Sequence, residues 1–224
     1  MLKHKNLVFL GTSHIAADSI KEIENAFAIE KPDIVAVELD PARLHALLTE
    51  RKPNYSIRMA FTLGFKGYLF AVIGSLVQQK LGDIVGVKPG SDMLRAVELA
   101  RDNGRRIALI DRDIQVTLAR LSKAIGWREK FNFFIDLVLA PFSKKMRIDI
   151  GKVPEKELIK QLLGLLKKRY PGLHRVLVEE RNKIMALKLK ALIENYPDKK
   201  IMAVMGAGHE ETVLEIIKAG QKRQ

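Results

Sequence analysis

The chain contains the stretch NLVFLGTSH at residues 6–14 and a related stretch, IMAVMGAGH, at residues 201–209. In each, an apolar run of strand length is followed by a glycine, two residues and a histidine, and a helix-like segment comes next. Continuous apolar runs are typical of parallel strands that helices cover on both faces. The two stretches therefore predict two strands of a mostly parallel sheet, each followed by the histidine of a Gly-x-x-His motif.

Between these two stretches, strand-like and helix-like segments alternate. Further strands are expected at residues 34–37 and 105–111, and helices at residues 18–29, from Pro41 onward and from Ser91 onward. This alternation predicts an α/β fold with a mostly parallel or mixed central sheet, flanking helices and an added helical layer. We expect a single domain over residues 1–224, with helical insertions at about 51–90 and 125–196.

The composition is that of a globular protein. The chain has 224 residues, of which 47% are hydrophobic and 29% charged, so it can bury one good core. It has no cysteine, which excludes a disulfide framework and a thiolate metal site and fits a reducing compartment. No apolar stretch has the length of a signal peptide or a transmembrane helix. We therefore expect a cytoplasmic protein, with association to a membrane as the alternative.

A formal net charge of +13 points to an anionic partner or to a solvated basic surface. The lysines and arginines are spread over helical segments, and neither a zinc finger nor a glycine-aromatic strand motif accompanies them. A solvated surface is the preferred interpretation, and nucleic acid is not an expected partner.

Several side chains that could take part in catalysis or binding follow the predicted strands. Ligands of open parallel sheets bind beyond the carboxyl ends of the strands, and the residues expected there are His14, Glu38, Asp111, Arg112 and His209. A glycine three residues before each histidine allows a sharp turn and the close approach of another group. We therefore predict that the two imidazoles meet at one mouth of the sheet. The alternatives are a simple ion pair at the end of the third strand and a solvated strand-end glutamate.

A further carboxylate lies on a predicted helix near the C-terminal end. Apolar residues recur with helical spacing on both sides of Glu180, so we expect this glutamate to point inward within the stripe formed by Leu177, Glu180, Ile184, Leu187 and Ala191. A buried carboxylate needs a cation, a hydrogen bond or a metal. A structural ion pair with Arg181 or Arg112 is the alternative to a functional role.

Taken together, the ordered motifs resemble the TraB/PrgY/GumN family, and the resemblance covers nearly the whole chain. The motifs are GTSH (11–14), PDIVAVELD (32–40), VGVKPGSDMLRAVELAR (85–101), IALIDRDIQVTLAR (107–120), EERNKIMA (179–186) and VMGAGH (204–209). They are most similar to the archaeal members of the pheromone-shutdown (TraB) branch. The resemblance implies a fold like that of erythromycin-esterase-like, ChaN-like and Tiki proteins. Family members often carry C-terminal membrane helices, so we expect a short member or part of a longer protein.

The resemblance also implies a set of site residues. The paired motifs imply metal ligation by His14 and His209, and the family's strand-end glutamate corresponds to Glu38. The implied catalytic residues are Glu38, Arg112, Glu180 and Arg181, and the implied binding residues are Gly11, Asp111, Asn182, Gly206 and Gly208. Tiki relatives are described as metal-dependent proteases, whereas the pheromone-shutdown branch lowers the activity of a peptide signal.

The expected function is metal-assisted hydrolysis of a peptide or a related small molecule. Both histidines would hold manganese, cobalt or zinc, and Glu38 or Glu180 would act as the general base. Arg112 and Arg181 would orient these carboxylates or stabilise the oxyanion. An esterase-like reaction with histidine as the base would need no metal.

The competing hypothesis is a non-catalytic regulatory protein that binds a partner or a membrane surface and so inhibits a peptide signal. It rests on the apolar segments 59–77 and 131–142, which lysines flank. Core packing of a helical layer is the simpler interpretation of these segments. Because glycine-punctuated helices pack closely, we also expect a homodimer.

Overall fold

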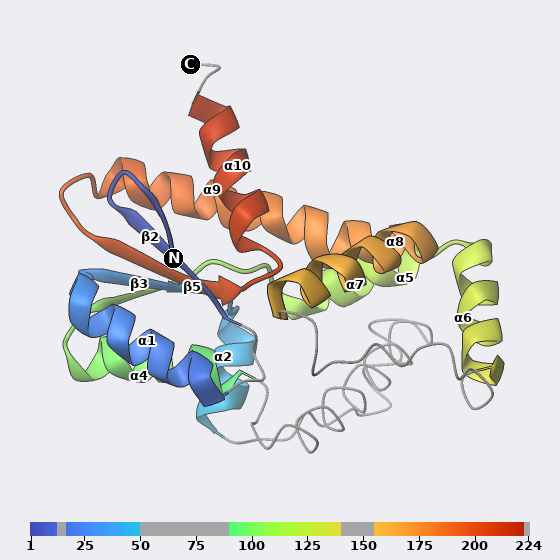
Figure 1. The fold of residues 1–224 in the computed structure, drawn as a ribbon, viewed down its shortest axis with the longest axis horizontal. Coiled ribbons are helices and arrows are strands. Elements are labelled where there is room, and N and C mark those ends of the chain that lie inside the picture. Colours follow the sequence, from blue (N-terminus) through green and yellow to red (C-terminus); the bar gives the residue numbers. More distant parts are fainter. Residues whose placement is uncertain (13–16, 50–89, 140–154, 222–224) are drawn as a thin grey trace.

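The computed structural model describes residues 1–12, 17–49, 90–139 and 155–221. Within these ranges the protein is an α/β structure built on a mixed five-stranded sheet (Figure 1). The strands are β1 (Leu2–His4), β2 (Leu7–Thr12), β3 (Ile34–Val37), β4 (Arg106–Leu109) and β5 (Ile201–Gly206), in the spatial order β1-β2-β5-β3-β4. Only β1 runs antiparallel to its neighbour. The predicted fold class is confirmed.

The strands of the two Gly-x-x-His motifs lie side by side. Strand β2 pairs in parallel with β5, so that Gly11 is opposite Met205 and Thr12 is opposite Gly206. Parallel strands that are distant in sequence come together in this way when helices cross between them. Strands β2 and β5 therefore end at the same edge of the sheet, and β3 lies on the other side of β5.

Helices cover both faces of the sheet (Figure 1). Alternate residues of each strand point to opposite faces, and on β5 the pair Met202 and Val204 joins one core cluster whereas Ala203 and Met205 join the other. The first cluster packs under α1 (Ala17–Glu30) and α4 (Ser91–Asp102), with α2 (Pro41–Leu48) at its border. The second packs under α9 (Glu180–Asn195) and α10 (Glu210–Gln221).

The remaining described helices form a lobe beside the sheet (Figure 1). They are α5 (Ile114–Ala124), α6 (Trp127–Leu139), α7 (Glu155–Arg169), α8 (Pro171–His174) and the π-helix η2 (Arg175–Glu179), which leads directly into α9. Leu121, Ile125 and Val176 make a small core of their own. Of the two predicted insertions, residues 51–89 of the first and 140–154 of the second lie outside the described residues, as does the apolar segment 59–77.

The predicted inner face of α9 is wrong. Leu187, expected to point inward, is 67% exposed, and the buried residues of the helix are Asn182, Met185, Ala186, Leu189 and Ile193. This second stripe has the same helical spacing. Its apolar members Met185, Ala186, Leu189 and Ile193 join the core cluster over the sheet. No helix among the described residues is long and apolar enough to cross a membrane.

Candidate functional site

Glu38 lies at the centre of a polar cluster at the carboxyl end of β3. Its own backbone N–H still donates to Val204 of β5, at 3.1 Å, so the side chain emerges between two strand ends. There its Oε2 accepts a hydrogen bond from the Gly206 N–H at 2.7 Å. The side chain is buried. The glycine of the second Gly-x-x-His motif thus helps to hold this carboxylate through its backbone.

His209 approaches the same carboxylate from the turn that follows β5. Its Nδ1 lies 2.5 Å from Oδ1 of Asn182, and its Nε2 lies 3.5 Å from Oε1 of Glu38. An amide oxygen can only accept a hydrogen bond, so Nδ1 carries the proton and Nε2 is the nitrogen directed at Glu38. Asn182 is fully buried on α9, which fixes the orientation of the ring.

Arg181 joins Glu38 to a second buried carboxylate, that of Asp111. Its Nη2 contacts Oε1 of Glu38 and lies 2.7 Å from Oδ2 of Asp111, and its Nε donates to Oδ1 of Asp111 at 3.0 Å. Burial by itself would lower the pKa of Arg181, but the negative charges of Glu38 and Asp111 outweigh it and raise that pKa. The guanidinium therefore stays charged between two carboxylates.

Arg43 completes the charge balance around Asp111 and was not predicted. Its Nη1 donates to Oδ2 of Asp111 at 2.9 Å and to the backbone oxygen of Glu38 at 3.4 Å. Asp40 positions it, because Asp40 Oδ1 caps α2 by accepting from the N–H groups of Ala42 and Arg43 at 2.9 and 3.1 Å. The signal was present in the sequence: Arg43 lies in the first turn of the helix that follows Glu38.

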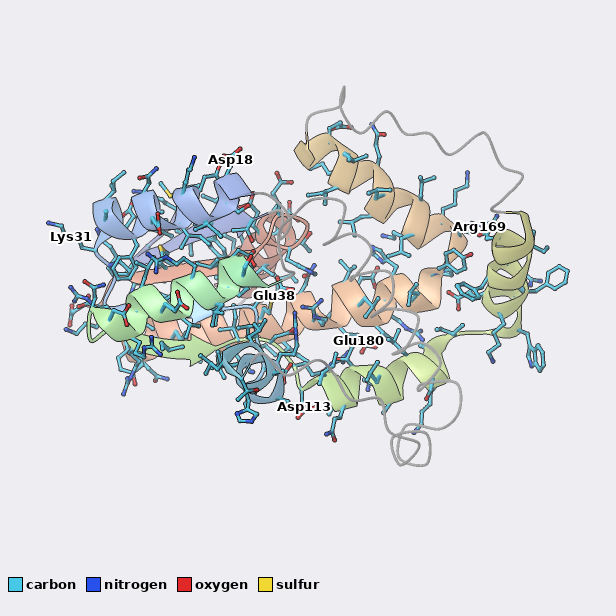
Figure 2. The ribbon with its side chains drawn as sticks, turned by 90° about the horizontal axis from the view of Figure 1, so that it is seen from below. Asp18, Lys31, Glu38, Asp113, Arg169 and Glu180 are labelled. Carbon is cyan, nitrogen blue, oxygen red and sulfur yellow. The ribbon has the colours of Figure 1, made fainter. Side chains whose placement is uncertain are left out.

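Glu180 belongs to a second ion cluster, formed with Arg112 and with Arg120 of α5. Arg112 Nη1 lies 2.8 Å from its Oε2, and Arg120 binds both carboxylate oxygens at 2.6 and 2.9 Å. Figure 2 labels Glu180 on α9, away from Glu38 at the sheet edge. Arg120 first and Arg112 second lower the pKa of Glu180 to about 2. The structure thus contains the ion pair with Arg112 that was the alternative to a functional role.

The end of β2 carries a polar pair that sequence reasoning missed. Thr12 Oγ1 donates to Oδ2 of Asp92 at 2.6 Å, and both side chains are buried. Asp92 lies in the first turn of α4, so this bond ties the first Gly-x-x-His strand to the helix layer. His14 lies outside the described residues. The predicted meeting of the two histidines therefore stays a prediction, supported by the pairing of the strands that lead to them.

Two glycines of the motifs lie where a larger residue would crowd its neighbours. A Cβ at Gly11 would lie 2.4 Å from Oε2 of Glu210 and 3.1 Å from the Cα of Ala207. A Cβ at Gly208 would lie 3.1 Å from Leu163 of α7. Gly11 is a residue of β2 and does not form the turn, so close approach explains it better than a sharp exit from the strand.

The site fits part of a metal centre. Two donor atoms at about 2.0–2.2 Å from one zinc ion lie roughly 3.3–3.6 Å apart in tetrahedral geometry, and His209 Nε2 and Glu38 Oε1 are 3.5 Å apart. Among the described residues, no three His, Cys, Asp or Glu side chains are grouped so that they could hold a metal ion. Since catalytic zinc sites use three protein ligands, the pair fits two of them, and the third predicted ligand is His14.

Comparison with known proteins shows which family the chain is similar to. The profile of the TraB/PrgY/gumN family matches residues 3–219. An uncharacterized protein of Methanocaldococcus jannaschii is 34% identical over 220 residues, covering 95% of this chain and 53% of that protein. The TraB domain-containing proteins of Bos taurus and Homo sapiens are 26% and 25% identical, each alignment covering 81% of this chain and 51% of the relative.

The chain spans about half the length of the curated relatives it matches. The family profile covers both Gly-x-x-His motifs and every residue of the polar cluster around Glu38. The chain belongs to the TraB/PrgY/gumN family.

Proposed function

We propose that this protein is a metal-dependent hydrolase that cleaves a peptide or a related small molecule at the site formed by His209 and Glu38. The observation that carries the proposal is the alignment of Asn182, His209 and Glu38. Asn182 places the proton of the imidazole on Nδ1, and Nε2 therefore faces a carboxylate oxygen. With a neutral imidazole, Nε2 and the carboxylate oxygen would both offer lone pairs, and at this distance they could share a cation, as in the carboxylate–histidine arrangements of metal sites.

His209, Glu38 and His14 are the residues that would hold the cation. A divalent ion such as manganese, cobalt or zinc would lower the pKa of a bound water and polarise the scissile carbonyl. Neutral imidazole and carboxylate are suitable donors for all three ions. The absence of cysteine from the chain is consistent with a site made of nitrogen and oxygen donors.

The protein's own side chains prepare this site electrostatically. Arg181 and the Gly206 N–H hold the two oxygens of Glu38 in place, which favours the ionised form of that carboxylate. Ionised Glu38 is the group that can bind the cation or accept a proton from the attacking water. Of the two predicted bases, we assign this role to Glu38, because Glu38 faces Nε2 of His209, whereas both oxygens of Glu180 are bound by arginines.

Cleavage assays with defined variants test the proposal. The wild-type protein, supplied with manganese, cobalt or zinc, is incubated with fluorogenic peptide pools and with nitrophenyl esters. We expect metal-dependent cleavage that falls by about 100-fold or more in Glu38→Gln and by about 10–100-fold in Asn182→Leu. His45→Ala is the matched control, because His45 is an exposed residue of α2. Cleavage that survives in His209→Ala, or that is absent from the wild type with all three ions, would contradict the proposal.

A further inference from the structure

One face of α6 carries large apolar side chains that are exposed to solvent. Trp127 is 83% exposed and Phe131 is 64% exposed. They lie four residues apart and therefore on the same face of the helix. A single exposed apolar residue is ordinary, but two exposed aromatic side chains one turn apart give this face of the helix an apolar character.

The acidic residues of α6 hold this face outward. Both carboxylates in the helix, those of Glu129 and Asp136, form their hydrogen bonds on the opposite side. Glu129 is buried and accepts from the N–H groups of Gly126 and Gly172 at 3.0 and 2.7 Å. Asp136 binds the guanidinium of Arg169 and the hydroxyl of Tyr170. Turning the aromatic face inward would break the contacts of both carboxylates.

The charges beside the aromatic face are positive. Arg128 is exposed and forms no ion pair within the described part of the chain. The ammonium of Lys130 lies 5.2 Å from the centre of the Trp127 ring. An aromatic face flanked by cations is the pattern of helices that lie in the interface of an anionic bilayer.

We propose that α6 is a membrane-surface helix that inserts Trp127 and Phe131 among the headgroups of an anionic lipid bilayer. Figure 1 shows α6 at the end of the molecule away from the sheet. The net charge of +13 favours a negatively charged surface. The same charge disfavours a second copy of the chain, which would bring Arg128 and Lys130 against their own counterparts. The proposal does not depend on the hydrolase.

The single tryptophan of the sequence makes the test direct. The intrinsic fluorescence of the whole chain is recorded during titration with vesicles of phosphatidylcholine alone, or of phosphatidylcholine mixed with phosphatidylglycerol. We expect a blue shift with the mixed vesicles and a much weaker one with phosphatidylcholine alone. Phe131→Ser should weaken partitioning by about tenfold or more, from the apolar area it no longer buries. Arg128→Glu should weaken it by about fivefold or more.

Ile29→Ser is the matched control, because Ile29 is an exposed apolar residue of α1, at 71% exposure. It should leave partitioning unchanged, and circular dichroism should show that all three variants fold. The absence of a blue shift with mixed vesicles would overturn the proposal, as would an equal loss in Ile29→Ser. A blue shift that grows with protein concentration in the absence of vesicles would overturn it in favour of self-association.

Discussion

Arg181 contacts two buried carboxylates at the site. Arg181 contacts Glu38 and Asp111, both almost fully buried, and Arg43 is the second cation of the group. Removing one partner from a buried ion pair leaves an uncompensated charge, which costs far more than the net stabilisation from the intact pair. Arg181 is therefore required for folding as well as for the ionised state of Glu38.

Arg181→Met is expected to lower the free energy of unfolding by about 3–5 kcal/mol, because Glu38 remains buried without its guanidinium partner and Asp111 keeps only Arg43. Urea unfolding at neutral pH measures the change. Arg95→Met is the matched control: Arg95 also pairs with two carboxylates, those of Glu24 and Glu98, but on the surface. It should cost about 1 kcal/mol or less. Equal losses in the two variants would show that burial does not add to the cost of removing an arginine from its carboxylates.

Glu180 should make stability depend on pH in the acid range. Its pKa in the folded protein is about 2, below the ordinary 4.5, because Arg120 and Arg112 stabilise the carboxylate. This contribution is fully present above about pH 5 and is lost as the pH falls toward 2. Glu180→Gln should therefore be less stable than the wild type at neutral pH, and the difference should shrink as the pH falls through this window.

Urea unfolding of both proteins between pH 7 and about pH 2 measures this difference. Arg120→Met should remove most of the same pH dependence, because Arg120 is the larger cause of the lowered pKa. A constant difference between wild type and Glu180→Gln at all pH values would contradict the assignment.

At the scale of elements, parallel pairing of β2 with β5 and of β5 with β3 creates the site. This pairing brings Thr12, Gly206 and Glu38 to one edge of the sheet, although Thr12 and Gly206 are 194 positions apart in the sequence. Helix α9 then crosses the sheet and delivers Asn182 and Arg181 from its start. Gly11 of the first motif has no Cβ, so the side chain of Glu210 can pack close to its backbone.

Gly11→Ala is expected to destabilise the protein by about 1–3 kcal/mol, because the new Cβ would overlap Glu210 and press on the backbone of Ala207. Thermal or urea unfolding measures it. Gly164→Ala in α7 is the control, since a Cβ there meets nothing within 4 Å. It should stabilise the protein by up to about 1 kcal/mol, through helix propensity. A Gly11→Ala variant as stable as the wild type would show that the approach of Glu210 is not tight.

The strands and helix starts could be predicted because local patterns specify them. Apolar runs marked β2, β3 and β5, and the Asp40-Pro41 pair marked the start of α2. The inner face of α9 could not be predicted in the same way. Two stripes of equal spacing compete there, and the choice depends on how well Met185, Leu189 and Ile193 fill the space over the sheet. That fit depends on the folded core, and the sequence of one helix does not specify it.

At the scale of the whole molecule, the candidate site and the aromatic face of α6 lie in different parts. The site is at the carboxyl edge of the sheet, and α6 is in the helical lobe (Figure 1). The strand-end rule placed Glu38, Asp111 and His209 correctly at one edge, because it follows from topology. It could not predict the contact of Arg43 with Asp111, the bond from Thr12 to Asp92, or the contact of Arg120 with Glu180, because these depend on side-chain contacts between elements far apart in the sequence.

The metal content of the purified protein tests the central claim most directly. The chain is purified without chelator or added metal, and bound manganese, cobalt and zinc are measured by elemental mass spectrometry. The same is done for His14→Ala, His209→Ala and Glu38→Gln, with His45→Ala as the control. The account predicts about one ion per chain in the wild type and the control, and far less in the other three variants. Equal and negligible metal in all five proteins, or metal retained by His209→Ala, would contradict it.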